Sequence, residues 1–108
     1  MDDGWTSVLA VEDLPEARLT HAELGDGGVL LFRTGGEVFA VGARCTHAGM
    51  PLARGQVKVS GSDAVVTCPA HGSRFRLNDG QVVRPPAQRP LPSYDVRQVE
   101  GCIELRPR

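Results

Sequence analysis

The stretch AVVTCPAHGSRFRLNDGQVV, residues 64–83, contains three strand patterns separated by a loop and a turn. Residues 64–67, 74–77 and 81–83 alternate or are rich in β-branched side chains, which is typical of β-strands. Between the last two strands lies Asn78-Asp79-Gly80, three residue types that favour a tight turn. The stretch therefore predicts a short antiparallel meander with a longer loop between its first two strands.

The same pattern continues outward in both directions. Further short strands are predicted, most of them separated by turns that contain glycine. The chain shows no convincing helical period, apart from one short turn within residues 11–17. Together these features predict an all-β fold, an antiparallel sandwich or barrel. The further predicted strands are residues 6–11, 17–24, 29–33, 37–41, 56–59, 93–98 and 102–105.

Length and composition are typical of a globular protein. The 108 residues fit one domain, residues 1–108, with 41% hydrophobic and 23% charged residues. The N-terminus, Met1-Asp2-Asp3-Gly4, lacks the pattern of a signal peptide, and no apolar stretch approaches the roughly 18 residues of a membrane span. We therefore expect a cytoplasmic monomer with no membrane or nucleic-acid partner.

Charge is distributed unevenly along the chain. The segment from Arg44 to Arg89 contains seven cations and two anions, whereas the remaining segments contain five cations and eleven anions. The net charge of −1 therefore hides a positive middle segment on an acidic body. A positive surface of this kind attracts an acidic partner and speeds encounter at low salt.

Two short motifs carry the chemistry, Cys45-Thr46-His47 and Cys68-Pro69-Ala70-His71. Three cysteines are too few for a disulfide framework, so cysteines close to histidines indicate metal ligands or catalytic groups. Each motif lies at the end of a predicted strand and is followed by a loop that contains glycine, so the two loops can face each other around one centre. Two centres match this ligand set: a tetrahedral zinc ion, or a [2Fe–2S] cluster with cysteines on one iron and histidines on the other.

The longer segments CTHAGMPL, residues 45–52, and CPAHGSRF, residues 68–75, resemble the two cluster-binding loops of Rieske ferredoxins. Twenty residues separate His47 from Cys68, a few more than is usual for that family. The surplus falls in the predicted turn at residues 58–63, where extra loop length costs little. The resemblance covers nearly the whole chain, because it also takes in residues 31–33, 38–41, 79–80, 85–91 and 94–96.

The resemblance implies a Rieske fold, in which two loops form a small cluster-binding subdomain, here about residues 44–90. It also implies one [2Fe–2S] cluster held by Cys45, His47, Cys68 and His71. Such ferredoxins are not enzymes themselves: they pass single electrons from a flavin-containing reductase to the terminal oxygenase of a ring-hydroxylating dioxygenase, in transient complexes. We expect the same role here. The alternatives are the small Rieske-like subunit of a nitrite reductase, which shares the fold, and a structural zinc domain.

The resemblance further predicts a low reduction potential. High-potential relatives carry an extra cysteine in each loop, joined as a disulfide, and a tyrosine that bonds a cluster cysteine. Met50, Ala70 and Phe75 stand at those positions here. Fewer hydrogen bonds to sulfur lower the potential. We therefore expect the low end of the Rieske range of about −150 to +300 mV, with Ser73 as the one remaining side-chain donor.

In the family the histidines lie at the exposed tip, so His47 and His71 are the expected edge for electron exit. Residues 48–52 and 85–87 are expected to form a small apolar rim for docking beside them. The third cysteine, Cys102, lies in the last predicted strand and is interpreted as a core residue.

Overall fold

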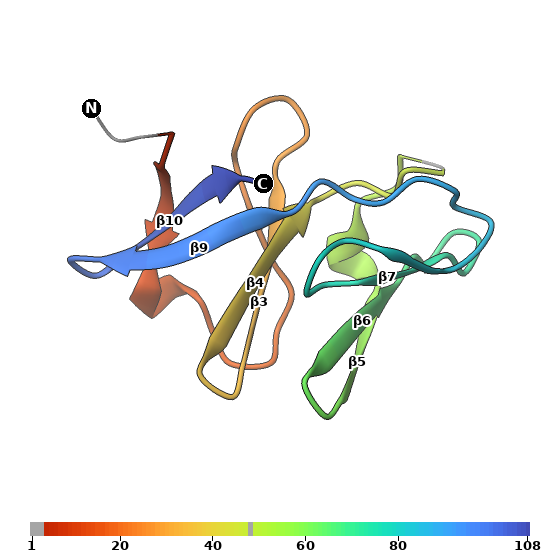
Figure 1. The fold of residues 1–108 in the computed structure, drawn as a ribbon, viewed down its shortest axis with the longest axis horizontal. Helices are drawn as coiled ribbons and strands as arrows, with labels where there is room; N and C mark the ends of the chain where they lie inside the picture. Colours follow the sequence, from red (N-terminus) through yellow and green to blue (C-terminus); the bar gives the residue numbers. More distant parts are fainter. Residues whose placement is uncertain (1–3, 48) are drawn as a thin grey trace.

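The computed structural model describes residues 4–47 and 49–108. The described chain folds into three antiparallel sheets, with strand orders β1-β10-β9, β2-β3-β4 and β5-β6-β7-β8 (Figure 1). Two short 3₁₀ turns, η1 (Val11–Asp13) and η2 (Leu52–Arg54), lie between strands. The strands are β1 (Thr6–Ala10), β2 (Thr20–Ala22), β3 (Val29–Thr34), β4 (Glu37–Gly42), β5 (Gln56–Ser60), β6 (Asp63–Thr67), β7 (Arg74–Arg76), β8 (Val82–Arg84), β9 (Tyr94–Val99) and β10 (Cys102–Pro107).

Strand β3 lies at the centre of the molecule and is buried on both of its faces. Its first four residues, Val29 to Phe32, form a continuous apolar run, as expected of a strand covered on both sides. Side chains alternate along a strand. Val29 and Leu31 therefore pack toward Ile103 and Leu105 of β10, while Leu30 and Phe32 pack with the core of the β5–β8 sheet.

The β5–β8 sheet and two loops form the part of the molecule that the sequence analysis singles out. The loop after β4 and the loop after β6 come together at the right-hand end of Figure 1. The first of them is connected to the rest of the molecule through β4, where the N–H of Gly42 donates to the Pro92 carbonyl at 2.8 Å. The two loops are thus carried on strands that are anchored in the core.

The all-β prediction is confirmed, and a strand lies at each predicted position. The prediction for residues 17–24 was too long, because β2 covers only Thr20–Ala22. Ala17 has a φ of 58°, outside the strand region, and its N–H donates to the Arg33 carbonyl at 2.7 Å. This long-range contact turns the chain before β2 begins.

The turn between β9 and β10 contains a residue poorly suited to its conformation. Glu100 and Gly101 have φ values of 49° and 81°, the pattern of a type I′ turn, in which Asn-Gly is preferred. A glutamate pays a steric penalty in this left-handed region that asparagine largely avoids. We expect Glu100→Asn to raise the free energy of unfolding by about 0.5–1 kcal/mol, measured by urea denaturation. Glu100→Gln, which removes the same charge, is the control; an equal gain from it would contradict the conformational explanation.

Among the described residues, none of the helices has the length and hydropathy required to cross a bilayer.

Candidate metal centre

The two motif loops share one backbone hydrogen-bond pattern. In the first loop, the N–H of Cys45 donates to the Met50 carbonyl at 2.9 Å, and the N–H of Gly49 donates to the Cys45 carbonyl at 2.8 Å. In the second loop, Cys68 donates to the Ser73 carbonyl at 2.8 Å and accepts from the N–H of Gly72 at 3.1 Å. Each cysteine is therefore held at the base of a closed loop.

Glycine is required at the same place in both loops. Gly49 has a φ of 69° and Gly72 a φ of 81°, a conformation that residues with a Cβ rarely adopt. This backbone turn reverses the chain after each histidine and closes the hydrogen-bonded loop. The backbone conformation alone therefore explains why glycine occupies this position in each loop, whether or not a ligand is bound.

Both cysteines of the motifs are buried in the core of the β5–β8 half. Cys45 is 3% exposed and Cys68 is 2% exposed, and the two belong to one apolar cluster with Leu52 and Phe75. Burial raises the pKa of the Cys68 thiol, and the neighbouring Cys45 thiol raises this pKa further. The backbone N–H groups of Ala70 and His71 act in the opposite direction, because they stabilise a thiolate.

The two histidines lie on the outside of the same site. His47 and His71 are both exposed, and their rings meet edge to face with centroids 5.1 Å apart. The structure thus brings together all four residues that the sequence analysis selected. It arranges them as two pairs: two thiols directed inward and two imidazoles directed outward.

This arrangement in pairs fits the second of the two candidate centres. Among the described residues, no group of three or more His, Cys, Asp or Glu side chains converges as the ligands of a single metal ion do. A [2Fe–2S] cluster has two irons, so it takes one ligand pair on each side. Two adjacent buried thiols opposite two adjacent imidazoles fit that requirement, and the N–H groups beside the Cys68 sulfur supply the donors that a bound thiolate needs.

The proline-rich segment 84–90 fastens both loops from one side. The hydroxyl of Thr46 donates to the Arg89 carbonyl at 2.7 Å, and the N–H of Ala87 donates to the Ser73 hydroxyl oxygen at 3.0 Å. Neither contact was predicted from the sequence, because no local pattern connects positions so far apart. The segment therefore fixes the distance between the two loops as well as covering them.

Ser73 is fully buried, and its hydroxyl has one interaction left to make. Its oxygen accepts from Ala87, which leaves the hydroxyl proton free to donate to a further acceptor. We expect Ser73→Ala to lower the free energy of unfolding by about 1–3 kcal/mol, because the Ala87 N–H loses its buried partner. The same change is expected to lower the midpoint potential, on the order of tens of millivolts, because a donor to sulfur is lost.

Denaturation and a redox titration of Ser73→Ala measure the two effects separately. Ser60→Ala, at an exposed position of the β5–β6 hairpin, is the matched control. A destabilised Ser73→Ala variant with an unchanged potential would show that this hydroxyl holds the proline-rich segment but does not reach the sulfur atoms.

The apolar rim predicted beside the histidines is smaller than expected. Leu52 is 0% exposed and Ala87 is 3% exposed, so both were wrongly placed on the rim and belong to the core instead. They are buried because η2 and the proline-rich segment turn these two side chains inward. The described part of the rim consists of Gly49, Met50, Pro51, Pro85 and Pro86; Ala48 lies outside the described residues.

Cys102, expected in the core, is half-buried at the start of β10. It pairs with Val99 of β9 and Ala10 of β1 in the sheet order of the other half of the molecule. It is therefore separate from the two buried cysteines of the motifs.

Unpaired positive charge collects on the half of the molecule that carries the loops. Elsewhere, four of the five described cations bond a carboxylate, namely Arg33, Arg97, Arg106 and Arg108. In the loop half, Arg76 pairs with Asp79 at 2.7 Å and lowers the pKa of that carboxyl. The other loop-half cations make no ion pair within the described chain: Arg44, Arg54, Lys58, Arg74, Arg84 and Arg89.

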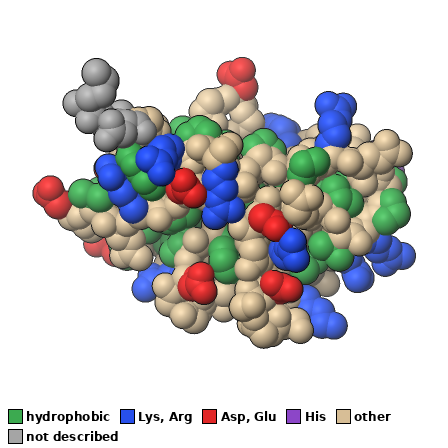
Figure 2. Space-filling model, viewed as in Figure 1, with side chains coloured by type: hydrophobic (Ala, Val, Ile, Leu, Met, Phe, Trp, Pro, Cys, Tyr) green, Lys and Arg blue, Asp and Glu red, His purple; other side chains and the backbone are tan. Residues whose placement is uncertain are grey.

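The same asymmetry is visible on the surface. On the face shown in Figure 2, the charged side chains at the right-hand end, where the loops lie, are lysines and arginines, whereas acidic side chains lie over the centre and left. The positive middle segment predicted from the sequence is therefore also a positive region in space. Because its charges are not neutralised internally, they remain available to a partner.

Comparison with known proteins shows the family to which the chain belongs. The Rieske [2Fe–2S] domain family matches residues 4–95. The chain is 35% identical over 91 residues to the 3-phenylpropionate/cinnamic acid dioxygenase ferredoxin subunit of Escherichia coli K12, covering 84% of this chain and 81% of that protein. It is also 35% identical over 100 residues to apoptosis-inducing factor 3 of mouse, covering 93% of this chain but only 16% of that much longer protein.

Solved structures show the same fold. The ferredoxin of carbazole 1,9a-dioxygenase from Nocardioides aromaticivorans superposes with a TM-score of 0.84 at 25% identity, covering 96% of this chain and 98% of that one. A putative NADH-dependent nitrite reductase small subunit from Mycobacterium tuberculosis superposes with a TM-score of 0.78 at 33% identity, covering 94% of this chain and 92% of that one. With its paired cysteines and histidines in two matching loops, the chain belongs to the Rieske [2Fe–2S] domain family, whose domain holds one [2Fe–2S] cluster.

Proposed function

We propose that Cys45, His47, Cys68 and His71 hold the cluster, and that this chain carries single electrons from a flavoprotein reductase to a terminal oxygenase. The observation that carries the proposal is the orientation of the ligand pairs. The thiols are buried within the core, whereas the imidazole rings are exposed at the end of the molecule. A partner that docks at the histidine edge would therefore meet the exposed ligands of the cluster directly, which suits transfer over a short distance.

The cluster, when bound, supplies reversible one-electron chemistry; the chain's own residues decide how easily the electron is accepted. Two thiolates and two neutral imidazoles leave an oxidised core without net charge, which favours reduction relative to four thiolates. The apolar surroundings of Cys45 and Cys68 exclude water from the inner side of the site. This burial favours electron exchange on the side of His47 and His71, whose rings are exposed.

The surface around the histidines fits brief encounters. The described rim exposes only small residues, prolines and a half-buried methionine, and the exposed large hydrophobic residues of the described chain, Val59 and Val83, lie on β5 and β8 instead. Redox partners commonly bury less than about 1,200 Å² in total. The unpaired cations around the loops would then guide an acidic partner to a contact that is itself weak.

The low-potential prediction distinguishes this carrier from the high-potential respiratory relatives. Phe75 is completely buried and has no hydroxyl, and Met50 and Ala70 have no thiol to form a disulfide. We expect a midpoint potential below about +100 mV, measured by an optical or electron paramagnetic resonance titration. A midpoint above that value would contradict the argument from missing hydrogen bonds to sulfur.

The proposed direction of transfer is tested by replacement of a known carrier. This protein would be substituted for the ferredoxin subunit in the purified 3-phenylpropionate/cinnamic acid dioxygenase system, with product formation as the readout. Turnover that requires this chain supports the carrier function. Isolation of the protein from its own cells in a stable complex with a siroheme-bearing large subunit would contradict it.

The second candidate is the small subunit of a nitrite reductase. It is favoured by the 33% identity to the putative subunit from Mycobacterium tuberculosis, and that similarity extends over almost the full length of both chains. Co-purification with a siroheme protein decides for this candidate. A cytoplasmic location and a monomeric state remain predictions under either function.

A further inference from the structure

We infer that the free edge of β5 is a docking site for an extended segment of a partner protein in which apolar and acidic residues alternate. Strand β5 lies at one end of the β5-β6-β7-β8 order, so its outer edge has no neighbouring strand. Within the described chain, residues 56–60 make no backbone hydrogen bond beyond their pairing with β6. An open edge of this kind is a template for an added strand.

The register of β5 and β6 shows which backbone groups of β5 are available to pair with an added strand. Val59 lies opposite Ala64, whose N–H donates to the Asn78 side chain at 3.1 Å and whose carbonyl accepts from the N–H of Leu77 at 2.7 Å. Ala64 therefore directs both of its backbone groups away from β5. Val59 is in a non-hydrogen-bonded pair, and by alternation so is Val57, which leaves the N–H and C=O groups of both valines on the outer edge.

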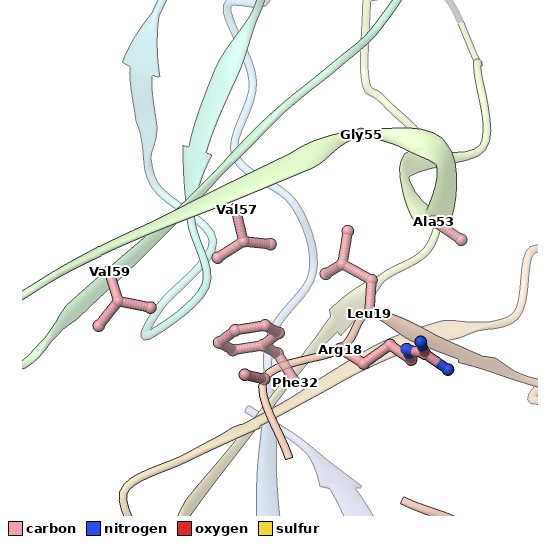
Figure 3. Close-up of a pocket in the computed structure, with 8 residues that line it drawn as sticks. Arg18, Leu19, Phe32, Ala53, Gly55, Val57 and Val59 are labelled. Atoms are coloured by element: carbon pink, nitrogen blue, oxygen red, sulfur yellow. The ribbon is translucent and has the colours of Figure 1, made fainter. Parts of the chain in front are cut away.

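A groove follows this edge, and most of the side chains that line it are apolar. It encloses about 360 Å³ and lies between β5 and the segment that leads into β2, with Phe32 at its base. Figure 3 shows Val57 and Val59 directed from β5 toward Phe32 and Leu19. Val59 is 46% exposed, one of the two exposed large hydrophobic residues of the described chain. A strand paired with β5 would place every second side chain over these residues, so those positions should be apolar.

The charges next to the groove indicate which residue types suit the alternate positions of the partner strand, those between its apolar residues. Lys58 lies between the two valines on the opposite face of β5, and Arg18 lines the groove. Both are exposed and make no ion pair within the described residues, and no carboxylate lines the groove. An added strand presents the side chains between its apolar residues on the face of Lys58. Acidic residues at those positions complete the match.

The same lysine argues against a second copy of this chain as the occupant. Antiparallel pairing of two β5 strands that used both valines would place the Lys58 residues of the two copies directly opposite each other. Like charges at opposing positions destabilise a strand pair, and a lysine in an edge strand is a common device against self-association. The site therefore favours an acidic strand from a different protein.

The docking site is distinct from the electron-transfer edge. The groove is lined by residues 17–19, by Phe32 and by Ala53, Gly55, Val57 and Val59, but by neither histidine. A partner anchored along β5 leaves His47 and His71 exposed. Such an anchor would raise the effective concentration of the carrier near its partner without blocking transfer.

The test uses the cluster-loaded protein and two capped heptapeptides, one alternating valine with glutamate and one alternating valine with lysine. Binding is measured by fluorescence anisotropy of labelled peptides, and hydrogen exchange is followed at the amides of β5. We expect the acidic peptide to bind at least tenfold more tightly than the basic one, with slowed exchange at Val57 and Val59. Equal binding of the two peptides, binding of neither, or unchanged exchange at both valines would overturn the proposal.

Variants identify the site. Lys58→Glu should reverse the preference between the peptides, whereas Arg84→Glu, the same reversal on the opposite edge strand β8, should leave it unchanged. Val59→Pro should abolish binding, because it removes an outward N–H while the β6 ladder needs no donor there. An unchanged cluster spectrum shows that each variant is folded. If the Val59→Pro variant is not folded, the reversed peptide preference of Lys58→Glu alone tests whether β5 is the binding site.

Two further outcomes would also overturn the proposal. Protection of the Val57 and Val59 amides without peptide, together with a dimer in sedimentation experiments, would assign the edge to a second copy. A preference for the acidic peptide that survives Lys58→Glu would place the binding elsewhere. Because no electron transfer is measured, failure here is distinguishable from failure of the proposed carrier function.

Discussion

The Cys68→Ala variant is expected to be isolated colourless and to give no [2Fe–2S] signal after dithionite reduction. Cys68 is 2% exposed, and its thiol lies beside that of Cys45 in the core. If Cys68 is a ligand, its removal would leave the cluster with one thiolate too few, and the remaining cysteine, Cys102, lies in the other half of the described chain. The measurements are iron and sulfide content together with electron paramagnetic resonance. Cys45→Ala is expected to behave in the same way.

Cys102→Ala is the matched control for this prediction. It removes the third cysteine, on β10 in the sheet formed with β1 and β9, and should keep the full iron content and the spectrum of the unaltered protein. A Cys102→Ala protein that lost its iron, or a Cys68→Ala protein that kept it, would show that the proposed ligands are wrong. His47→Ala and His71→Ala are expected to lose the cluster or to change its spectrum, because each variant lacks one of the two proposed imidazole ligands.

The second large effect is expected on the rate of encounter. In the Arg54→Gln, Arg89→Gln double variant, the second-order rate constant for electron transfer should fall several-fold, up to about tenfold, at low salt. Both side chains are exposed on the loop half and make no ion pair within the described chain, so their charge acts on a partner instead of on a neighbour. Stopped-flow reduction with the reductase, over a range of ionic strengths, measures the effect. The rates of variant and unaltered protein should converge as salt increases.

A control of equal net charge separates steering from overall charge. Thr6→Glu with Gln98→Glu also lowers the net charge by two, but at exposed positions of β1 and β9. It should slow the reaction much less. Equal slowing by the two double variants would show that net charge alone matters, and no salt dependence in either would remove electrostatic steering from the mechanism.

Most of the local structure could be predicted from the sequence alone, because turns and loops depend on neighbouring residues. Asn78-Asp79-Gly80, Thr34-Gly35-Gly36 and, through its glycine, Glu100-Gly101 each mark a chain reversal by residue type, and a strand lies on both sides of every one. The two motifs proposed to hold the cluster are equally local. Cysteine and histidine two or three positions apart are brought together by a single loop, whichever sheet carries it.

Only the tertiary structure decided how these local pieces act together. The sequence shows four ligand candidates, but which pair is buried depends on the packing of Cys45 and Cys68 against Leu52 and Phe75. The failure to foresee that Leu52 and Ala87 are buried has the same origin. A position within a loop has no period that reveals its direction, so its burial depends on contacts from distant segments.

Long-range contacts also decided which charges and edges are free. Whether an arginine is neutralised depends on a carboxylate distant in the sequence, as with Arg97 and Glu104 at 2.7 Å. The open edge of β5 likewise follows from strand order, and no single strand contains that information. Residue types therefore determined the strands, turns and ligand motifs of this protein, since these depend on backbone preferences over a few residues. Burial, charge pairing and the exposed edge were decided by the fold, because each requires two parts of the chain to meet.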